Sequence, residues 1–354
     1  MTAYLQGLST TLPPFCLTQT EGRDRATLIF CGKYPQFDRL AKTFDTAGID
    51  KRYSVVPIDW FSENHGWVDR TRAYLDGAKA MFISAAHGAL TDARWQARDV
   101  DFVVTVTSTG IATPTLEAQV FTDIGFRSDI IRVPMFGLGC AGGVSGLSIA
   151  ATLARGRPGA KVLLVVVEAC SLSFRADRFQ KAYIIAAVLF GDGAAAACLS
   201  SEPSGSETQI SFGHGIQKIW PDTLDIMGWD VDETGLGVVF DRSIPTFVTD
   251  EFATATRAAL LASDLSVSQI DRFVCHPGGA KVVEAIEGAL HLKSGCLDAE
   301  RAVLRDAGNM SAPTVMFVMK SVLNAGATGQ MMACALGPGF TASYLPFHVK
   351  TGLN

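Results

Sequence analysis

One cysteine in a glycine-rich segment is the first candidate for chemistry in this sequence. Cys140 lies within Gly-Leu-Gly-Cys-Ala-Gly-Gly (residues 137–143), after an apolar run and before a helix-like pattern. A cysteine at the start of a helix faces unpaired backbone N–H groups and the positive end of the helix dipole, and both stabilise a thiolate. Because glycine has no side chain, we expect the flanking glycines to let a substrate approach the sulfur closely. Cys140 is therefore a candidate nucleophile, with an inert buried thiol as the alternative.

The same segment also matches the G-x-G-x-x-G fingerprint of dinucleotide-binding proteins, and Glu168 follows the next apolar run as a possible ribose-binding acid. In that class of protein the fingerprint belongs to the first strand–helix unit, and the acid follows about 20 residues later. Here the segment comes after several earlier elements, and Glu168 lies somewhat beyond that spacing. A nicotinamide oxidoreductase is thus the weaker interpretation.

Two further segments carry polar side chains at element ends. His276 directly follows a short β-like run and precedes Pro-Gly-Gly, a turn that would present the imidazole at the carboxyl edge of a sheet. Catalytic groups of α/β proteins collect at that edge. Asn309 stands in Gly-Asn-Met-Ser-Ala-Pro, before an apolar helical run. Its side chain could cap the helix, or its amide could donate a hydrogen bond to a developing oxyanion.

The composition indicates a globular protein with a thick apolar core. Of its 354 residues 48% are hydrophobic and 18% charged. The strongly apolar stretch of residues 162–167 stops at Glu168, far short of the ~20 residues that a membrane-spanning helix needs. The N-terminus lacks the basic start and apolar run of a signal peptide. We therefore expect a cytoplasmic oligomer that buries its surplus apolar surface at a subunit interface, with no integral membrane segment.

Charge and cysteine spacing exclude other classes. The net charge of −5 disfavours a nucleic-acid partner, which usually requires a basic face. The eight cysteines form no Cys-x-x-Cys pair, so neither a zinc site nor a disulfide framework is expected. We expect no metal site.

Short β-rich runs alternate with longer helical patterns, which predicts a layered α/β fold. The Ser/Pro/Gly-rich stretch of residues 200–207 is the predicted boundary between two halves, residues 1–204 with Cys140 and residues 205–354 with His276 and Asn309. Strands are expected at Phe102–Val106, Ile130–Phe136, Val162–Val167, Ala194–Leu199, Arg272–Cys275, Met331–Leu336 and Ala342–Phe347. Helices are expected at Trp67–Ala89, Leu116–Ile124, Ala141–Ala154, Phe247–Ala262, Lys281–Leu290 and Pro313–Asn324.

Together the motifs GCAGG, FGDGAAA, HPGG, GNMS and GPG resemble, in their order along the chain, the type III polyketide synthases, the chalcone and stilbene synthase-like branch of the thiolase superfamily. The resemblance runs from about Arg39 to Phe347. It implies a homodimer with a thiolase-like, five-layered αβαβα fold made of two duplicated halves. It also implies acyl-CoA starters and malonyl-CoA extenders, with no carrier protein and no cofactor. Ketoacyl synthase III enzymes share a Cys-His-Asn set but usually carry His-Gln-Ala-Asn where this chain has His-Pro-Gly-Gly.

The family's catalytic triad corresponds to Cys140, His276 and Asn309. The resemblance implies that Cys140 carries the acyl chain while His276 and Asn309 drive decarboxylation of malonyl-CoA and hold the enolate. Phe190 corresponds to the aromatic gate between the CoA tunnel and the cavity. The basic positions for CoA correspond to Arg39 and Lys42, with Thr46 in place of the third, and Lys281 lies near a further CoA contact.

Departures from the plant enzymes bear on the product. Smaller residues replace cavity threonines and the partner gate residue, whereas a tryptophan replaces a glycine that limits chain growth; the cavity set is Ser108, Cys170, Ser173, Trp229, Val238 and Ser311. Thr113 replaces a methionine that crosses the plant dimer interface, which leaves that contact open.

The segments around Cys170 and Trp229 look similar to bacterial alkylresorcinol and alkylpyrone synthases. We therefore predict a long-chain fatty acyl starter, two or three malonyl extensions, and cyclisation to a resorcinol or a pyrone. The alternatives are a ketoacyl synthase III-like enzyme that uses acyl carrier protein, and a non-catalytic member of the superfamily that binds acyl-CoA.

Overall fold

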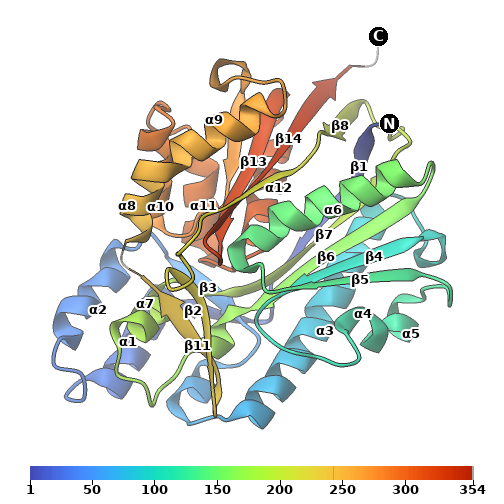
Figure 1. The fold of residues 1–354 in the computed structure, drawn as a ribbon. Helices are drawn as coiled ribbons and strands as arrows, with labels where there is room; N and C mark the ends of the chain where they lie inside the picture. Colours follow the sequence, from blue (N-terminus) through green and yellow to red (C-terminus); the bar gives the residue numbers. More distant parts are fainter. Residues whose placement is uncertain (242, 353–354) are drawn as a thin grey trace.

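The computed structural model describes residues 1–241 and 243–352. Its centre is a sheet whose first five strands come from the N-terminal part of the chain (Figure 1). β1 pairs antiparallel with β7, β7 pairs antiparallel with β6, and β6 pairs parallel with β4, which pairs parallel with the edge strand β5. These strands are β1 (Ala3–Thr11), β4 (Phe102–Thr107), β5 (Ile131–Phe136), β6 (Lys161–Ala169) and β7 (Asp192–Ser200).

The C-terminal strands repeat this pairing pattern. β8 pairs antiparallel with β14, β14 pairs antiparallel with β13, and β13 pairs parallel with β12, while β9 also pairs with β14. Pairing of β1 with β8 joins the two sets into one ten-stranded sheet. The repeated order fits the duplicated halves predicted from the resemblance, and the boundary at residue 204 stays a prediction. These strands are β8 (Thr208–Phe212), β9 (Ile216–Ile219), β12 (Arg272–Cys275), β13 (Gly329–Gly337) and β14 (Thr341–Thr351).

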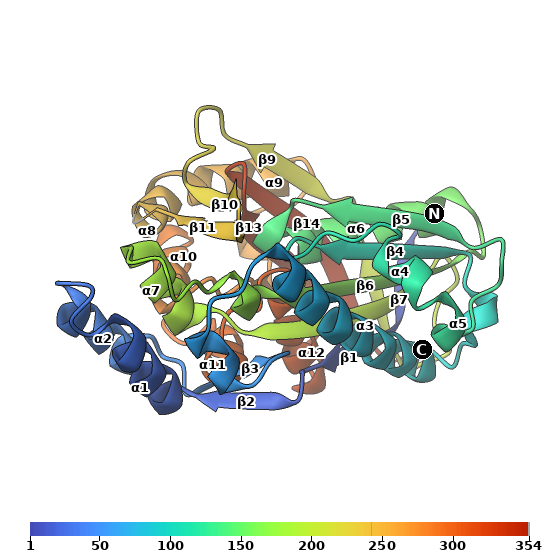
Figure 2. The same cartoon turned by 90° about the horizontal axis from the view of Figure 1, so that it is seen from below.

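Three apolar clusters mark the three helical layers. The first lies between α3 (Trp67–Asp92) and one face of the N-terminal strands. The second surrounds α6 (Gly142–Gly156) and α12 (Thr314–Asn324), which lie between the N-terminal and C-terminal strands. The third packs α9 (Ala253–Leu261) and α10 (Ala280–Ala289) on the outer face of the C-terminal strands. The layers follow one another as α, β, α, β, α, which confirms the predicted fold class (Figures 1 and 2).

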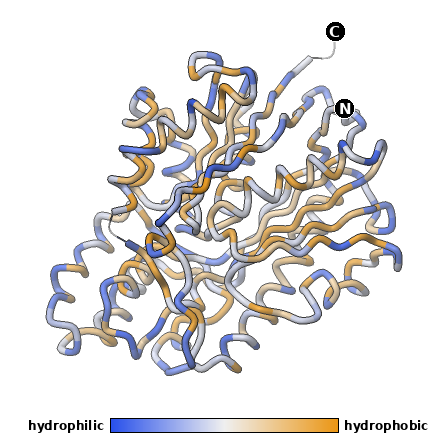
Figure 3. The backbone as a smooth tube through the Cα atoms, in the orientation of Figure 1, coloured by the Kyte–Doolittle hydropathy of each residue, from blue (hydrophilic) through white to orange (hydrophobic). Residues whose placement is uncertain are grey.

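Every strand predicted from the sequence is present, with bounds that differ by a few residues. Hydrophobic residues follow the central strands, whereas hydrophilic residues gather at loops and outer helix faces (Figure 3). Two predicted helices are interrupted. Residues 116–124 form α4 (Leu116–Gln119) and α5 (Phe121–Ile124), and residues 247–262 include the end of α8 (Ile244–Phe247) and a π-helical turn (Val248–Phe252) before α9.

Several elements had no clear periodic signal and were not predicted. Most of them lie around one end of the sheet and form the surroundings of the site described below (Figure 1). They are β1, β8 and β9 of the central sheet, together with β2 (Phe15–Thr18), α1 (Gln19–Phe30), α2 (Phe37–Thr46), β3 (Lys51–Ser54), α7 (Lys181–Leu189), β10 (Met227–Asp232), β11 (Gly235–Phe240) and α11 (Asp298–Ala307). Throughout the described ranges, the helices are too short or too polar to cross a membrane.

The start of α6 approaches α12 closely because it lacks side chains. A Cβ on Gly143 would lie 2.2 Å from the carbonyl oxygen of Ala312, and a Cβ on Gly142 would lie 2.8 Å from Val106 Cγ1. Real Cβ atoms do not come this near to backbone oxygens, so a larger residue at position 143 would push the two central helices apart.

We predict that Gly143→Ala lowers the free energy of unfolding by about 2 kcal/mol, because the added methyl group meets a rigid backbone oxygen. Gly156→Ala is the matched control: it lies at the other end of α6 with no atom within 4 Å of the added Cβ. The control should be as stable as the parent protein or slightly more stable, since alanine favours a helix. Chemical denaturation measures both, and equal stability of the two variants would contradict the packing argument.

Candidate active site

Cys140 lies in a turn between the edge strand and the central helix layer. β5 ends at Phe136, a short 3-10 turn spans Gly139–Ala141, and α6 begins directly afterwards. The backbone N–H of Gly139 donates to Ser108 Oγ at 3.1 Å, which ties this turn to the end of β4. Cys140 is 7% exposed. The turn thus holds the sulfur at a helix N-terminus, as predicted.

The glycines beside Cys140 serve the packing of the backbone. Gly139 has a φ of +47°, and a Cβ there would lie 2.6 Å from Pro338. From the other side, a Cβ on Gly337 would lie 2.7 Å from the backbone nitrogen of Ala141. These two glycines let the Cys140 turn and the Gly-Pro-Gly loop pack together. Gly137 and Gly139 also line the large cavity beside Cys140, and their role in substrate approach stays a prediction.

The structure brings Cys140, His276 and Asn309 to the wall of one small apolar cavity. His276 directly follows β12, and Asn309 follows α11 after Gly308. The Asn309 side chain is held at both ends, because its Nδ2 donates to the carbonyl of Gly278 at 3.1 Å and its Oδ1 accepts from the backbone N–H of Ser311 at 2.8 Å. The second hydrogen on Nδ2 is available to Cys140 in this structure, and it could donate to a substrate oxygen at the same place.

Burial makes Cys140 and His276 neutral at pH 7 when each is considered alone. It raises the pKa of the Cys140 thiol to about 11, although hydrogen bonds from the side chains of Ser311 and Asn309 act in the opposite direction. It lowers the pKa of the His276 imidazole to about 3, and neither ring nitrogen has a hydrogen-bond partner within the described ranges. A proton passed from thiol to imidazole creates two opposite charges at one cavity, which stabilise each other. The reactivity of Cys140 should therefore depend on His276.

A larger cavity adjoins Cys140 and encloses about 1000 Å³ of space not filled by protein atoms. The hairpin of β10 and β11 forms much of its wall, with Trp229 opposite Val238 in the strand register. Trp229 Nε1 donates to the carbonyl of Ser108 at 2.6 Å, so the indole spans from the hairpin to the end of β4. The predicted cavity residues on this wall are Ser108, Cys170, Phe190, Trp229, Val238 and Ser311.

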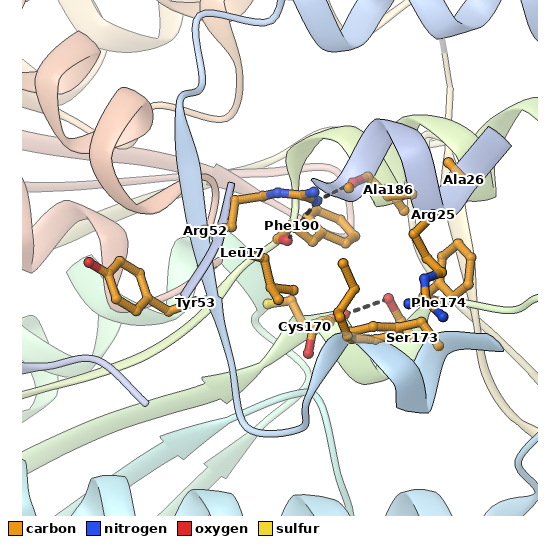
Figure 4. Close-up of a pocket in the computed structure, with 15 residues that line it drawn as sticks. Leu17, Arg25, Ala26, Arg52, Tyr53, Cys170, Ser173, Phe174, Ala186 and Phe190 are labelled. Atoms are coloured by element: carbon orange, nitrogen blue, oxygen red, sulfur yellow. Dashed lines mark hydrogen bonds between the residues drawn. The ribbon is translucent and has the colours of Figure 1, made fainter. Parts of the chain in front are cut away.

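Ser173 does not line the large cavity but lies on neighbouring pockets. Its hydroxyl donates to the carbonyl of Cys170 at 2.7 Å, and it shares one apolar pocket with Cys170 and Phe190 (Figure 4). Cys170 and Phe190 line both that pocket and the large cavity, which we call the catalytic cavity from here on, and therefore lie between the two.

Phe190 lies directly beside Asn309. The backbone N–H of Asn309 donates to the carbonyl of Leu189 at 2.8 Å, and that of Gly191 donates to the carbonyl of Asn309 at 3.0 Å. These bonds form a bridge between residues 190 and 309. The position predicted to be a gate is thus coupled through the backbone to a predicted catalytic residue.

Two buried acids that shape the site were missed as functional residues. Glu168 ends an apolar strand, and its Oε2 accepts from the backbone N–H of Ser108 at 2.9 Å and from Thr109 Oγ1 at 2.7 Å. Asp192 accepts from Ser171 and from the backbone N–H of Val55. Burial raises the pKa of Glu168 to about 8 and that of Asp192 to about 6. The sequence signal for such a residue is an acid at one end of an otherwise apolar strand. From the sequence, Glu168 is a candidate only for ribose binding.

The predicted CoA-binding residues lie on the protein surface. Arg39 and Lys42 are exposed on α2, and Lys281 is exposed on the first turn of α10. The loop after α2 lies near the start of α10, because a Cβ on Gly48 would lie 3.8 Å from Ala280 Cβ. The guanidinium of Arg39 donates to Gln36 Oε1. In the described residues no group of three or more metal-ligating side chains is gathered at one place.

Comparisons with known proteins establish the family. The model of the N-terminal domain of chalcone and stilbene synthases matches residues 2–203, and that of the C-terminal domain matches residues 211–347. A putative chalcone synthase of Bacillus subtilis is 32% identical over 99% of this chain and 100% of its own length. The 1,3,6,8-tetrahydroxynaphthalene synthase of Streptomyces peucetius is 34% identical over 88% of this chain and 84% of its own length.

Solved structures agree with these matches. The crystal structure of the 1,3,6,8-tetrahydroxynaphthalene synthase of Streptomyces coelicolor, a bacterial type III polyketide synthase, has a TM-score of 0.93 and 26% identity, covering 99% of this chain and 100% of that chain. The chain belongs to the chalcone and stilbene synthase family of type III polyketide synthases. It is therefore an acyltransferase of the decarboxylative Claisen type that acts on CoA thioesters without a further cofactor.

We predict that His276→Ala slows alkylation of Cys140 by iodoacetamide at pH 7 by about tenfold or more, because only the thiolate reacts. Without a partner to take its proton, the thiol keeps its raised pKa of about 11. Its thiolate fraction, and with it the rate in the variant, should rise about tenfold per pH unit between pH 7 and pH 9. Mass spectrometry of the Cys140 peptide measures the rate.

The exposed Cys16 provides the internal control and should react equally in both proteins. Equal labelling of Cys140 at pH 7 in the parent protein and the variant would show that His276 does not activate the thiol.

Proposed function

We propose that this enzyme loads a long-chain fatty acyl group from CoA onto Cys140, extends it with malonyl-CoA, and cyclises the product to an alkylresorcinol or an alkylpyrone. The Cys140 thiolate attacks the starter thioester and the CoA thiolate leaves. Malonyl-CoA then loses CO₂, and the enolate oxygen accepts hydrogen bonds from His276 and Asn309. The enolate carbon attacks the Cys140 thioester and releases the sulfur for the next transfer. Donors placed where this charge develops contribute about 3–4 kcal/mol each in comparable enzymes.

The observation that carries the starter proposal is the apolar pocket behind Cys170 and Phe190. The pocket and the solvent at its open mouth together span about 550 Å³, and apolar side chains such as Leu17, Ala26 and Phe174 line it (Figure 4). From the large cavity, an alkyl chain would pass the small Cys170 side chain to reach this pocket. There it would be transferred from water into apolar surroundings. Each buried methylene group favours binding by about 0.8 kcal/mol, so a pocket of this kind selects for chain length.

The remaining parts of the proposal concern how the CoA thioesters bind and where the enzyme works. Arg39, Lys42 and Lys281 would hold the CoA phosphates at the surface, and Phe190 would close the catalytic cavity toward the CoA. Exclusion of water protects both the thioester and the enolate from hydrolysis and protonation. We propose a cytoplasmic location, where both CoA thioesters are available.

The names of relatives point to three product classes, α-pyrone, tetrahydroxynaphthalene and phloroglucinol. One relative, from Mycobacterium tuberculosis and 26% identical over 98% of this chain, is named for α-pyrone synthesis, in line with the proposal. The synthases from two Streptomyces species are named for 1,3,6,8-tetrahydroxynaphthalene. Tetrahydroxynaphthalene formation is therefore the second candidate function. It differs in that the product carries no alkyl tail.

The deciding experiment is a product profile by mass spectrometry. Purified protein is incubated with malonyl-CoA alone and with a ladder of acyl-CoA starters from hexanoyl to octadecanoyl, without carrier protein. Tailed resorcinols or pyrones from the long starters support the proposal. Tetrahydroxynaphthalene from malonyl-CoA alone supports the second candidate, and a strong preference for octanoyl or shorter starters contradicts the pocket as the acyl site.

We predict that Cys170→Phe lowers kcat/KM for hexadecanoyl-CoA by about tenfold or more, because the ring blocks the passage into the pocket, while the value for hexanoyl-CoA stays within about twofold. Ala26→Leu is the matched variant, since Ala26 lies on the wall of the same pocket but not on the catalytic cavity. It should reduce use of only the longest starters. If both variants keep the parental chain-length profile, the pocket does not hold the acyl chain.

We also propose a homodimer that forms over β5. This edge strand exposes Ile131 and Phe136, and the loop before α4 exposes Ile111 close by. Ile111 and Phe136 also lie on the rim of the catalytic cavity, so a second copy on this face would complete the cavity wall. An exposed apolar edge strand is otherwise a site of aggregation. Thr113 lies in the same loop as Ile111, and the replacement of the family's methionine by threonine leaves its contact with the second copy open.

We predict that Ile131→Lys converts the protein from dimer to monomer at micromolar concentration, because each subunit would bury an unpaired charge in the interface. Leu261→Lys is the control, since Leu261 is 75% exposed at the end of α9, away from β5. Light scattering after size-exclusion chromatography measures both masses. A dimer that persists in the first variant would place the interface elsewhere.

A further inference from the structure

The hairpin of β10 and β11 forms one wall of the large cavity and is separate from the central sheet. Across the described part of the chain, its two strands pair only with each other and not with the ten-stranded sheet. A two-stranded hairpin alone is marginally stable in water, so its position depends on the contacts that hold it. The hairpin carries Trp229 and Val238, and therefore any shift of the hairpin changes the shape of the cavity.

A cluster of charged groups holds the tip of the hairpin. Asp232, at the end of β10, accepts from Arg175 Nη1 at 3.1 Å and from Arg178 Nη2 at 2.7 Å. Its backbone carbonyl accepts from Trp67 Nε1 at 2.8 Å, and the Thr234 N–H and hydroxyl both donate to Oδ1 at 2.8 Å. We refer to Asp232, Arg175 and Arg178 as the Asp232 clamp.

The clamp is built into the protein and is not a chance surface pair. The Arg175 side chain is 1% exposed, and the Asp232 side chain is 25% exposed. The Thr234 backbone N–H, the largest cause, together with the Thr234 hydroxyl and Arg175, holds the pKa of Asp232 far below its usual range. The carboxylate is therefore charged throughout the physiological range, and charge-assisted bonds of this kind are among the stronger ones in proteins.

The clamp and the cavity meet through Trp229, three residues before Asp232 on the same strand. Besides the large cavity, Trp229 lines a second, small pocket, which lies against Arg70, Tyr74 and Ser173. The indole, together with Ile111 and Leu236, therefore lies between the two spaces, and its Nε1 donates to the carbonyl of Ser108. If the hairpin moves outward, this bond breaks and the two spaces join.

We propose that Asp232 is a positioning residue that sets the number of malonyl extensions by holding Trp229 against Ser108. With the clamp closed, the indole ends the space into which the growing chain can fold. With the clamp open, the chain reaches the second pocket and takes further extensions before release. This inference rests on the proposed chain-extending function but not on the identity of the starter.

The test compares product ratios of the full-length enzyme with malonyl-CoA and the starter that the parent protein uses best. Asp232→Asn removes the charge and should shift the ratio of over-extended to parental product by roughly threefold or more, a change within the range of measured couplings between contacting residues. Glu233→Gln removes a neighbouring, exposed charge at the same turn and should leave the ratio unchanged. Asp232→Glu keeps the charge and should restore the parental ratio at least in part.

A double-mutant cycle separates positioning from general destabilisation. In a Trp229→Ala background the partition is already absent, so Asp232→Asn should add no further shift in product ratio. If Asp232→Asn fails to fold, Arg178→Gln opens the more exposed side of the clamp while Arg175 keeps Asp177 and Asp232 as partners. It should shift the ratio in the same direction.

The outcomes are distinct. A parental ratio in Asp232→Asn, or an equal shift with and without Trp229, overturns the role of Asp232. The absence of any polyketide from the parent protein would instead contradict the proposed chain-extending function.

Discussion

The close packing of the Cys140 turn against the C-terminal part of the chain is the constraint on which the site depends. Gly143 meets the carbonyl of Ala312, and Gly139 meets Pro338, so each contact joins a residue beside the predicted nucleophile to a segment far later in the chain. This approach brings the start of α6 to the same cavity as His276 and Asn309. Glycine at these positions thus allows the two sets of strands and helices to join closely.

Burial at this junction also decides the chemistry. It disfavours the charged form of Cys140 and of His276, so neither group is activated alone. The pair becomes reactive when one proton moves between them, because the two charges then appear together next to the first turn of α6. The same exclusion of water suits a reaction whose enolate would be lost to protonation in an open site. Catalytic need and apolar packing therefore act in the same direction.

The cavity wall and the predicted catalytic residues belong to different parts of the fold. Cys140, His276 and Asn309 belong to the central layers, whereas the hairpin with Trp229 and Val238 is attached from outside through α7 and a few polar contacts. Such a division lets the wall vary between relatives while the chemistry stays the same, in keeping with the tetrahydroxynaphthalene, phloroglucinol and α-pyrone named for them. The product is accordingly the property that family membership leaves open.

The sequence alone determined the layered α/β class, the buried strands and the three candidate catalytic residues, because apolar runs and glycine-rich turns are local patterns. It did not reveal the hairpin, whose short strands pair only with each other in the described chain, nor the roles of Glu168 and Asp192, whose partners are distant in sequence. Ser173 was placed on the cavity by analogy, yet it lies on neighbouring pockets. Only the tertiary structure decided which side chains share a cavity, because that depends on contacts between segments that no local spacing relates.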